Sequence, residues 1–173
     1  FSGKLISQTR YGENPHQKAA IYSKNNHQDI IQLSGKELSY NNYNDLYSAL
    51  STTKLLPNNK GVAIIKHANP CGVSINQNKV KCFKEALESD PISAFGGIVS
   101  CNFKMNVNLA KEINKIYFEI IMAKGFDKKS TNLLKKKKNL RIIDTSNFRG
   151  ESKFNFTSKY DSILIQNVDN KNF

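Results

Sequence analysis

Two cationic side chains, Lys66 and His67, stand together at the end of an apolar run in the segment AIIKHANPCGVS, residues 63–74. A neutral imidazole can accept a proton near pH 7, and a neighbouring ammonium opposes a second positive charge on the ring. The same ammonium can stabilise negative charge that develops on a transferred group. The pair therefore suits general-base chemistry, and a structural histidine is an equal alternative on these two residues alone.

The pair can serve one site only where its strand ends, because adjacent side chains on a regular strand point to opposite faces. The segment NPCG, residues 69–72, predicts that end and a tight loop after it. Ligands of open α/β sheets bind outside the carboxyl ends of strands. The sequence thus places Lys66 and His67 where a site is expected.

Cys71 invites two other chemistries. Its Pro-Cys setting resembles half of a zinc deaminase motif, but Ser74 takes the place of the second cysteine and no His-x-Glu is present. Zinc needs a set of three or four ligands, so we expect no zinc. A nucleophilic thiol needs a base in reach and a lowered pKa. The sequence favours a small packed residue instead.

The segment RYGENPHQ, residues 10–17, is loop-like and rich in binding groups. Arg10 can fork onto a phosphate, and Tyr11 offers a hydroxyl donor or an aromatic platform. The alternative is an ordinary surface turn around Asn14 and Pro15.

The segment DPISAFGG, residues 90–97, joins an Asp-Pro turn to a Gly-Gly pair. Gly96 would let the backbone approach a ligand closely while Phe95 stacks on a ring. The alternative is a loop after a helix, with the phenylalanine packed into the core.

The elements that must position these residues follow an α/β pattern of alternating apolar runs and amphipathic stretches. We expect a largely parallel sheet with helices on both faces, followed by an antiparallel pair at residues 153–166. The expected strands are 19–23, 29–35, 62–66, 97–100, 118–123 and 140–144, and the expected helices are 44–55, 78–90, 106–117 and a Lys-rich helix after residue 123.

The net charge of +12 would suit a nucleic acid, an anionic membrane or small anionic ligands. Lys and Asn are frequent throughout, however, and the dense run LLKKKKN, residues 133–139, has no interleaved aromatics. We interpret that run as the solvated face of a short helix and expect neither nucleic acid nor membrane as a partner. Three widely spaced cysteines argue against a disulfide framework and favour the cytosol.

Four segments, RYGENPHQ, GKELSYNN, KHANPCGVS and DPISAFGGIVS, occur in the order and approximate spacing of one family. They resemble the bifunctional purine biosynthesis enzymes that join AICAR transformylase to IMP cyclohydrolase. The resemblance implies a three-layer α/β/α fold, a cytidine-deaminase-like unit without zinc. Residues 1–18 would form an introductory segment, and residues 19–173 the first such unit of the transformylase domain. The cyclohydrolase domain and the second transformylase unit would lie outside this chain.

The resemblance also implies an activity, the transfer of a formyl group from 10-formyltetrahydrofolate to AICAR, giving FAICAR and tetrahydrofolate on the way to IMP. His67 would be the proton acceptor and Lys66 the transition-state stabiliser. The family resemblance further implies a cytosolic homodimer with the site at its interface and leaves room for a monovalent cation. The chain by itself would be inactive.

By the same resemblance, a second set of residues would hold AICAR. The set comprises Arg10, Tyr11, Asn42, Gly96 and Glu119, with Phe95 beside them. The sequence departs from the family at Asp161 and Ser162, where a Gly-Gly pair is usual. The competing hypotheses are a zinc-free, deaminase-like nucleotide-binding unit or hydrolase and a basic nucleic-acid-binding module without catalysis.

Overall fold

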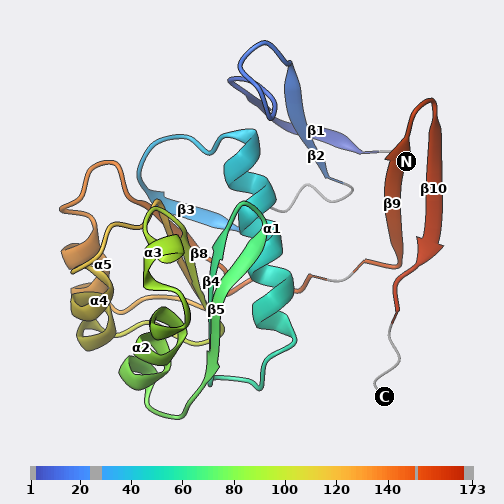
Figure 1. Cartoon of the computed structure of the whole chain (residues 1–173). Helices are drawn as coiled ribbons and strands as arrows, with labels where there is room; N and C mark the ends of the chain where they lie inside the picture. Colours follow the sequence, from blue (N-terminus) through green and yellow to red (C-terminus); the bar gives the residue numbers. More distant parts are fainter. Residues whose placement is uncertain (1–2, 24–28, 151, 170–173) are drawn as a thin grey trace.

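A six-stranded sheet forms the centre of the molecule in the computed structural model, which describes residues 3–23, 29–150 and 152–169 (Figure 1). Its order is β3-β8-β7-β6-β4-β5. The strands are β3 (Ile31–Ser34), β4 (Gly61–Lys66), β5 (Asn69–Ile75), β6 (Ile98–Cys101), β7 (Ile120–Ala123) and β8 (Arg141–Asp144).

The sheet is mixed, so the expectation of a largely parallel sheet is wrong. The only parallel pairs in this sheet are β6 with β7 and β7 with β8. Strand β4 is antiparallel to both β5 and β6, and β3 is antiparallel to β8. Apolar runs report that a strand is buried but not its direction. The direction of β5 follows from the two-residue turn after β4, which only an antiparallel pair can accommodate.

Helices cover both faces of the sheet, which confirms the three-layer α/β/α architecture. Alternate residues of β4 show the division: Ala63 and Ile65 pack toward one core, Val62 and Ile64 toward the other. The first core lies under α1 (Tyr40–Lys54), and the second under α2 (Lys79–Ser89), α3 (Pro91–Ala94), α4 (Val107–Ile113) and α5 (Lys128–Leu134). In the described ranges, none of the helices has the length and apolar character needed to cross a membrane.

Helix α1 begins four residues before the predicted start because of a capping box. The Ser39 hydroxyl accepts a 3.2 Å hydrogen bond from the Asn42 N–H, and the Asn42 side-chain oxygen accepts one from the Ser39 N–H. Together these bonds satisfy two N–H groups that lack helical partners. The capping box also fixes the Asn42 side chain and leaves its NH₂ group to point elsewhere.

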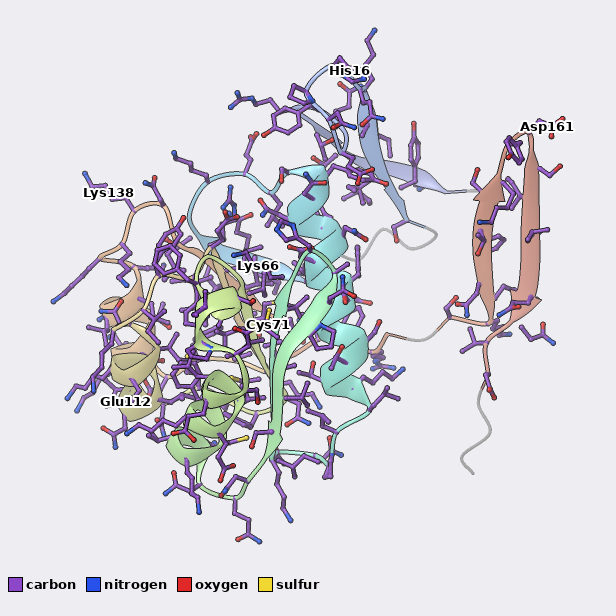
Figure 2. All side chains as sticks on the ribbon, in the orientation of Figure 1. His16, Lys66, Cys71, Glu112, Lys138 and Asp161 are labelled. Atoms are coloured by element: carbon purple, nitrogen blue, oxygen red, sulfur yellow. The ribbon has the colours of Figure 1, made fainter. Side chains whose placement is uncertain are left out.

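Two hairpins complete the chain. Strand β1 (Lys4–Thr9) pairs with β2 (Ala19–Ser23), and β9 (Phe154–Lys159) pairs with β10 (Ser162–Asn167), both antiparallel. The second hairpin confirms the predicted terminal pair and stands apart from the sheet, with every strand residue exposed (Figure 1). Asp161 lies at its tip (Figure 2). The expected connection at residues 24–28 lies outside the described residues.

We expected the lysine run to lie on the face of a short helix, but it does not. Helix α5 ends at Leu134, and residues 135–138 follow in turns. Lys138 extends from the periphery of the molecule (Figure 2), whereas the Lys137 ammonium donates to the Asn114 carbonyl at 2.8 Å. The run is nevertheless mostly solvated, in agreement with its interpretation as surface.

Candidate active site

The chain reverses direction at His67 itself. Strand β4 ends at Lys66, which pairs with Asn69, and the two residues between them have φ angles of 52° for His67 and 59° for Ala68. Two successive positive φ angles are typical of a type I′ hairpin turn, which usually contains Asn or Gly. The predicted loop at residues 69–72 is therefore wrong, because these residues begin β5. Each non-glycine residue held in this region stores strain of roughly 1–3 kcal/mol.

Helix α1 holds the strained turn from one side. The Asp45 carboxylate accepts a 2.7 Å hydrogen bond from the Ala68 N–H, and the Ser48 hydroxyl donates one of 2.7 Å to the Ala68 carbonyl. The Asn69 side chain donates a third, also 2.7 Å, to the His67 carbonyl. These three bonds over-determine the turn, so the exposed His67 side chain projects from a fixed backbone.

Lys66 links the turn to the loop between α3 and β6. Its half-buried ammonium donates to the Phe95 carbonyl at 2.9 Å. Asp90, which caps α3, also lies within its electrostatic reach. Hydrogen bonds from Ser93 and, to a smaller extent, the positive charge of Lys66 hold the pKa of Asp90 below its usual range. The ammonium retains further donors for a ligand, because lysine carries three.

The α3–β6 loop presents an aromatic ring to solvent. Phe95 is 58% exposed and lies 5.4 Å, centroid to centroid, from the Tyr117 ring, so it is not a core residue. Gly96 has a φ of 75°, and its N–H donates to the Tyr117 carbonyl at 2.9 Å. A Cβ on Gly97 would lie 2.7 Å from the Ile65 carbonyl oxygen, so glycine is required for this loop to meet the end of β4.

Glu119 and Asn42 meet beside this loop. The Glu119 N–H donates to the Gly97 carbonyl at 3.0 Å, and its carboxylate accepts a 3.1 Å hydrogen bond from the Asn42 side chain. The Arg141 guanidinium lies 3.9 Å from the same carboxylate and donates twice, at 3.2 Å, to the Glu37 carbonyl. Two predicted residues and one unforeseen arginine thus converge at the start of β7 and β8.

The site lies at one edge of the sheet, where strand ends of both kinds meet. Lys66 is at the carboxyl end of β4, as predicted, but β4 runs antiparallel to β6, and Ile65 pairs with Ile98 at the amino end of β6. Glu119 and Arg141 likewise stand at the amino ends of β7 and β8. The candidate site is therefore opposite the edge where the three parallel strands deliver their carboxyl ends.

Arg10 and Tyr11 lie in a separate place, in the turn after β1. The Thr9 hydroxyl donates to the Tyr11 carbonyl at 2.8 Å, and the Arg10 guanidinium carbon lies 5.6 Å from the Tyr11 ring centroid. The Asn41 side chain donates to the Glu13 carbonyl at 3.2 Å, which ties this turn to the start of α1. The structure does not bring Arg10 or Tyr11 into contact with Lys66 or His67.

Cys71 and Gly72 have packing roles. Burial, followed by the charge of Asp90, raises the pKa of the Cys71 thiol, which disfavours a nucleophilic thiolate. A Cβ on Gly72 would lie 1.8 Å from the Ala86 carbonyl oxygen, so β5 and α2 touch there backbone to backbone. Across the three described ranges, no three His, Cys, Asp or Glu side chains gather as a metal-binding group would.

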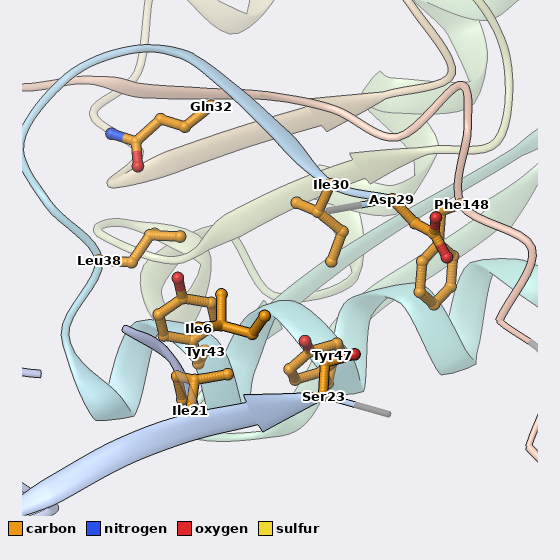
Figure 3. A pocket seen from close by; sticks show the side chains of 10 residues that line it. All are labelled: Ile6, Ile21, Ser23, Asp29, Ile30, Gln32, Leu38, Tyr43, Tyr47 and Phe148. Atoms are coloured by element: carbon orange, nitrogen blue, oxygen red, sulfur yellow. The ribbon is translucent and has the colours of Figure 1, made fainter. Parts of the chain in front are cut away.

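A cavity of about 260 Å³ lies between the β1–β2 hairpin, α1 and β3 (Figure 3). Ile6 and Ile21 line it from the hairpin, and Tyr43 and Tyr47 line it from α1. Burial raises the pKa of both tyrosines. No predicted site residue lines this cavity.

Sequence reasoning missed the residues that hold the site together. Asp45 carried a signal, since it is a carboxylate three residues after Asn42 and one before the buried Leu46, on the sheet-facing side of α1. Arg141 carried a weaker one, as a charged residue that opens a buried strand. The roles of these two residues become clear only in three dimensions, where Asp45 lies beside the turn and Arg141 beside the Glu119 carboxylate.

These features define a three-layer α/β/α protein in which a histidine, a lysine and an exposed aromatic ring share one sheet edge with a carboxylate. The chain belongs to the AICARFT/IMPCHase bienzyme family, whose family model matches residues 1–173.

Relatives named bifunctional purine biosynthesis protein PurH are similar to most of the chain. The protein of Thermoanaerobacter sp. is 46% identical over 148 residues, 83% of this chain and 29% of the relative. Those of Prochlorococcus marinus strain MIT 9515 and Fusobacterium nucleatum are 43% and 41% identical over 96% and 99% of this chain. They are covered over 35% and 34% of their own length, so the chain spans about a third of the relatives it matches.

Proposed function

We propose that this chain supplies the proton-accepting part of an AICAR formyltransferase, which uses 10-formyltetrahydrofolate in purine biosynthesis. The observation that carries the proposal is His67 on a strained turn, beside a Lys66 ammonium that is held at one sheet edge. Family membership and relatives named for purine biosynthesis support the substrate assignment.

His67 acts as the base in this proposal. The exocyclic amine of AICAR is conjugated with its ring and is a poor nucleophile, so proton removal accompanies its attack on the formyl carbon. The Lys66 ammonium stabilises the negative charge that develops on the formyl oxygen. The C–N bond between the formyl carbon and the folate then breaks, the folate nitrogen takes up the proton that His67 removed from the amine, and tetrahydrofolate leaves.

Glu119, Asn42, Gly96 and Phe95 hold the substrates. Glu119 is a hydrogen-bond acceptor whose neighbours, Asn42 and Arg141, orient it, and it suits N–H donors of AICAR. The exposed Phe95 offers a stacking surface for a ring, and the backbone at Gly96 permits close approach.

Arg10 and Tyr11 bind the AICAR phosphate in this proposal, although they lie apart from His67 within one chain. A homodimer with its site at the subunit interface would supply them from the second copy. We assign residues 1–18 to the introductory segment and 19–173 to the first deaminase-like unit. In this proposal, the part of the full-length enzyme that corresponds to the unmatched regions of the relatives supplies the rest of the folate site, any monovalent cation site and the cyclohydrolase. We place the whole enzyme in the cytosol.

The test uses the full-length gene product, incubated with AICAR and 10-formyltetrahydrofolate. We expect tetrahydrofolate in an amount equal to the sum of FAICAR and the IMP that the cyclohydrolase forms from it, with neither purine product when either substrate is left out. Hydrolysis of the folate without FAICAR or IMP, or deamination of a nucleotide, would contradict the proposed transfer.

A further inference from the structure

A second cavity, of about 300 Å³, opens at the sheet edge opposite His67. The parallel strands β6, β7 and β8 end there, and the residue after each of them, Asn102, Lys124 and Thr145, lines the cavity. The carboxyl ends of parallel strands are where ligands of α/β sheets commonly bind. A volume near 300 Å³ falls at the lower end of the range for small-molecule pockets.

The cavity is positively charged. Lys54, Lys124 and Arg149 line it, and none of its described lining residues is Asp or Glu. The Lys54 ammonium donates to the Gly150 carbonyl at 2.8 Å, and that of Lys124 donates to the Asn58 side-chain oxygen at 3.3 Å. Each bond orients its ammonium and leaves two N–H donors, while the Arg149 guanidinium can bind an oxyanion with two parallel hydrogen bonds.

The end of α1 would oppose an anion here, because the last carbonyls of a helix carry partial negative charge. The buried Asn102 side chain counters this effect. Its NH₂ group lies 3.3, 3.2 and 3.0 Å from the carbonyl oxygens of Thr53, Leu56 and Pro57. The Asn102 oxygen accepts from the Gly61 N–H at 2.9 Å, so the amide is fixed with its donors toward the helix end.

Part of the remaining wall is apolar, and the rest is made of neutral polar residues. Phe148, Leu50 and Leu56 line the same cavity as the three cations. An aromatic and two aliphatic side chains beside a cationic cluster suit a flat ring that carries an anionic group.

We propose that this cavity binds a small phosphate monoester with a planar ring, its phosphate on Lys54, Lys124 and Arg149 and its ring against Phe148. The site is distinct from the candidate active site, because the strands β6, β7 and β8 separate the two edges. A four-residue strand spans about 13 Å. The inference does not depend on the proposed formyl transfer.

The experiment measures binding of adenosine 5′-monophosphate to the full-length protein by calorimetry. The starting variant is Arg10→Ala/Tyr11→Ala, which removes the proposed phosphate contacts of the candidate active site. We expect this variant to bind the nucleotide. Adding Lys124→Ala/Arg149→Ala to it should weaken nucleotide binding at least 30-fold, because charge-assisted contacts contribute about tenfold each to the affinity. The control Lys136→Ala/Lys138→Ala removes the same charge from exposed residues elsewhere and should leave Kd unchanged.

Two further probes test the ring. Phe148→Ala should weaken the binding of adenosine monophosphate several-fold and leave the binding of ribose 5-phosphate unchanged. An equal loss in the Lys136/Lys138 control, or no loss in Lys124→Ala/Arg149→Ala, would overturn the site. Equal affinity for inorganic phosphate and the nucleotide would overturn the role of the ring. In an otherwise wild-type protein, Lys124→Ala/Arg149→Ala should keep the formyl transfer rate, which separates this inference from the proposed function.

Discussion

The Asp45 carboxylate accepts a 2.7 Å hydrogen bond from the backbone N–H of Ala68, the residue directly after His67. The bond reaches from the middle of α1 to a turn in which His67 and Ala68 both have positive φ. A charged acceptor is well suited to hold such a turn, because hydrogen bonds to ionised groups are about twice as strong as neutral ones. The position of the proposed base thus depends on a residue from another layer of the fold.

Asp45→Ala should therefore destabilise the protein and slow formyl transfer. Loss of a hydrogen bond to a charged group lowers the free energy of unfolding by roughly 1.5–3 kcal/mol. We expect kcat to fall about tenfold and the KM for folate to change less, because the turn positions the base. The control is Asn44→Ala, an exposed neighbour on α1. Equal effects of the two variants on kcat would contradict a positioning role for Asp45.

Ala68→Gly should stabilise the protein. Glycine removes left-handed strain of roughly 1–2 kcal/mol and adds an entropic cost of about 0.5–1 kcal/mol, so the net gain is about 0.5–1 kcal/mol. Ala63→Gly, in the buried part of β4, should have the opposite sign. Urea unfolding of the two variants measures both changes, and a destabilised Ala68→Gly would show that the turn is not strained.

The turn also shows why the sequence did not predict the site in full. The apolar run from Val62 to Ile65 predicted a buried strand, and Pro70 predicted a change of chain direction. The chain reverses instead at His67 and Ala68, whose residue types do not predict a turn. A type I′ turn without Asn or Gly is held by tertiary bonds from Asp45 and Ser48. Contacts of that kind join residues about 20 positions apart and leave no local pattern.

Gly72→Ala should be strongly destabilising. The new Cβ would lie 1.8 Å from the Ala86 carbonyl oxygen, so β5 and α2 must separate. We expect a loss of about 3 kcal/mol or more in the free energy of unfolding. Val73→Ala, at the next residue of β5 and 40% exposed, should cost about 1 kcal/mol or less. Comparable losses would show that the glycine does not serve close packing.

Stability should fall in acid partly through Asp127, the N-cap of α5. Hydrogen bonds, chiefly from the Ser130 N–H, hold the pKa of Asp127 below its usual range. A depressed folded-state pKa gives stabilisation that is complete above the unfolded pKa of about 3.9 and is lost as pH falls through the folded value. The stability difference between wild type and Asp127→Ala should therefore shrink below about pH 4.

The matched variant Asp127→Asn separates charge from capping. Asparagine caps a helix about as well as aspartate but does not titrate. Its stability relative to Asp127→Ala should stay constant between pH 7 and pH 3 in urea unfolding. A wild-type advantage that is equally constant over this range would show that the carboxylate does not contribute through its charge.

Much of the fold was predictable because apolar runs mark buried strands, as for β4, β6 and β7. Strand direction was not, since it depends on connections and not on composition. At the site, Asn42 and Glu119 were both identified by resemblance, but their hydrogen bond joins residues 77 positions apart. Arg141 was not predicted because its proximity to Glu119 arises only in the folded chain.

The role of His67 as the base is tested most directly by comparing His67→Ala with His16→Ala in the full-length protein. We expect a 10²–10⁴-fold fall in the single-turnover rate of formyl transfer for His67→Ala, the usual contribution of a general base. We also expect AICAR binding, measured by calorimetry, to be retained. His16 lies far from Lys66 on the β1–β2 hairpin (Figure 2), so its removal should leave the single-turnover rate nearly unchanged. Normal turnover in His67→Ala would show that His67 is not the base and would leave the Lys-His turn as a structural hairpin.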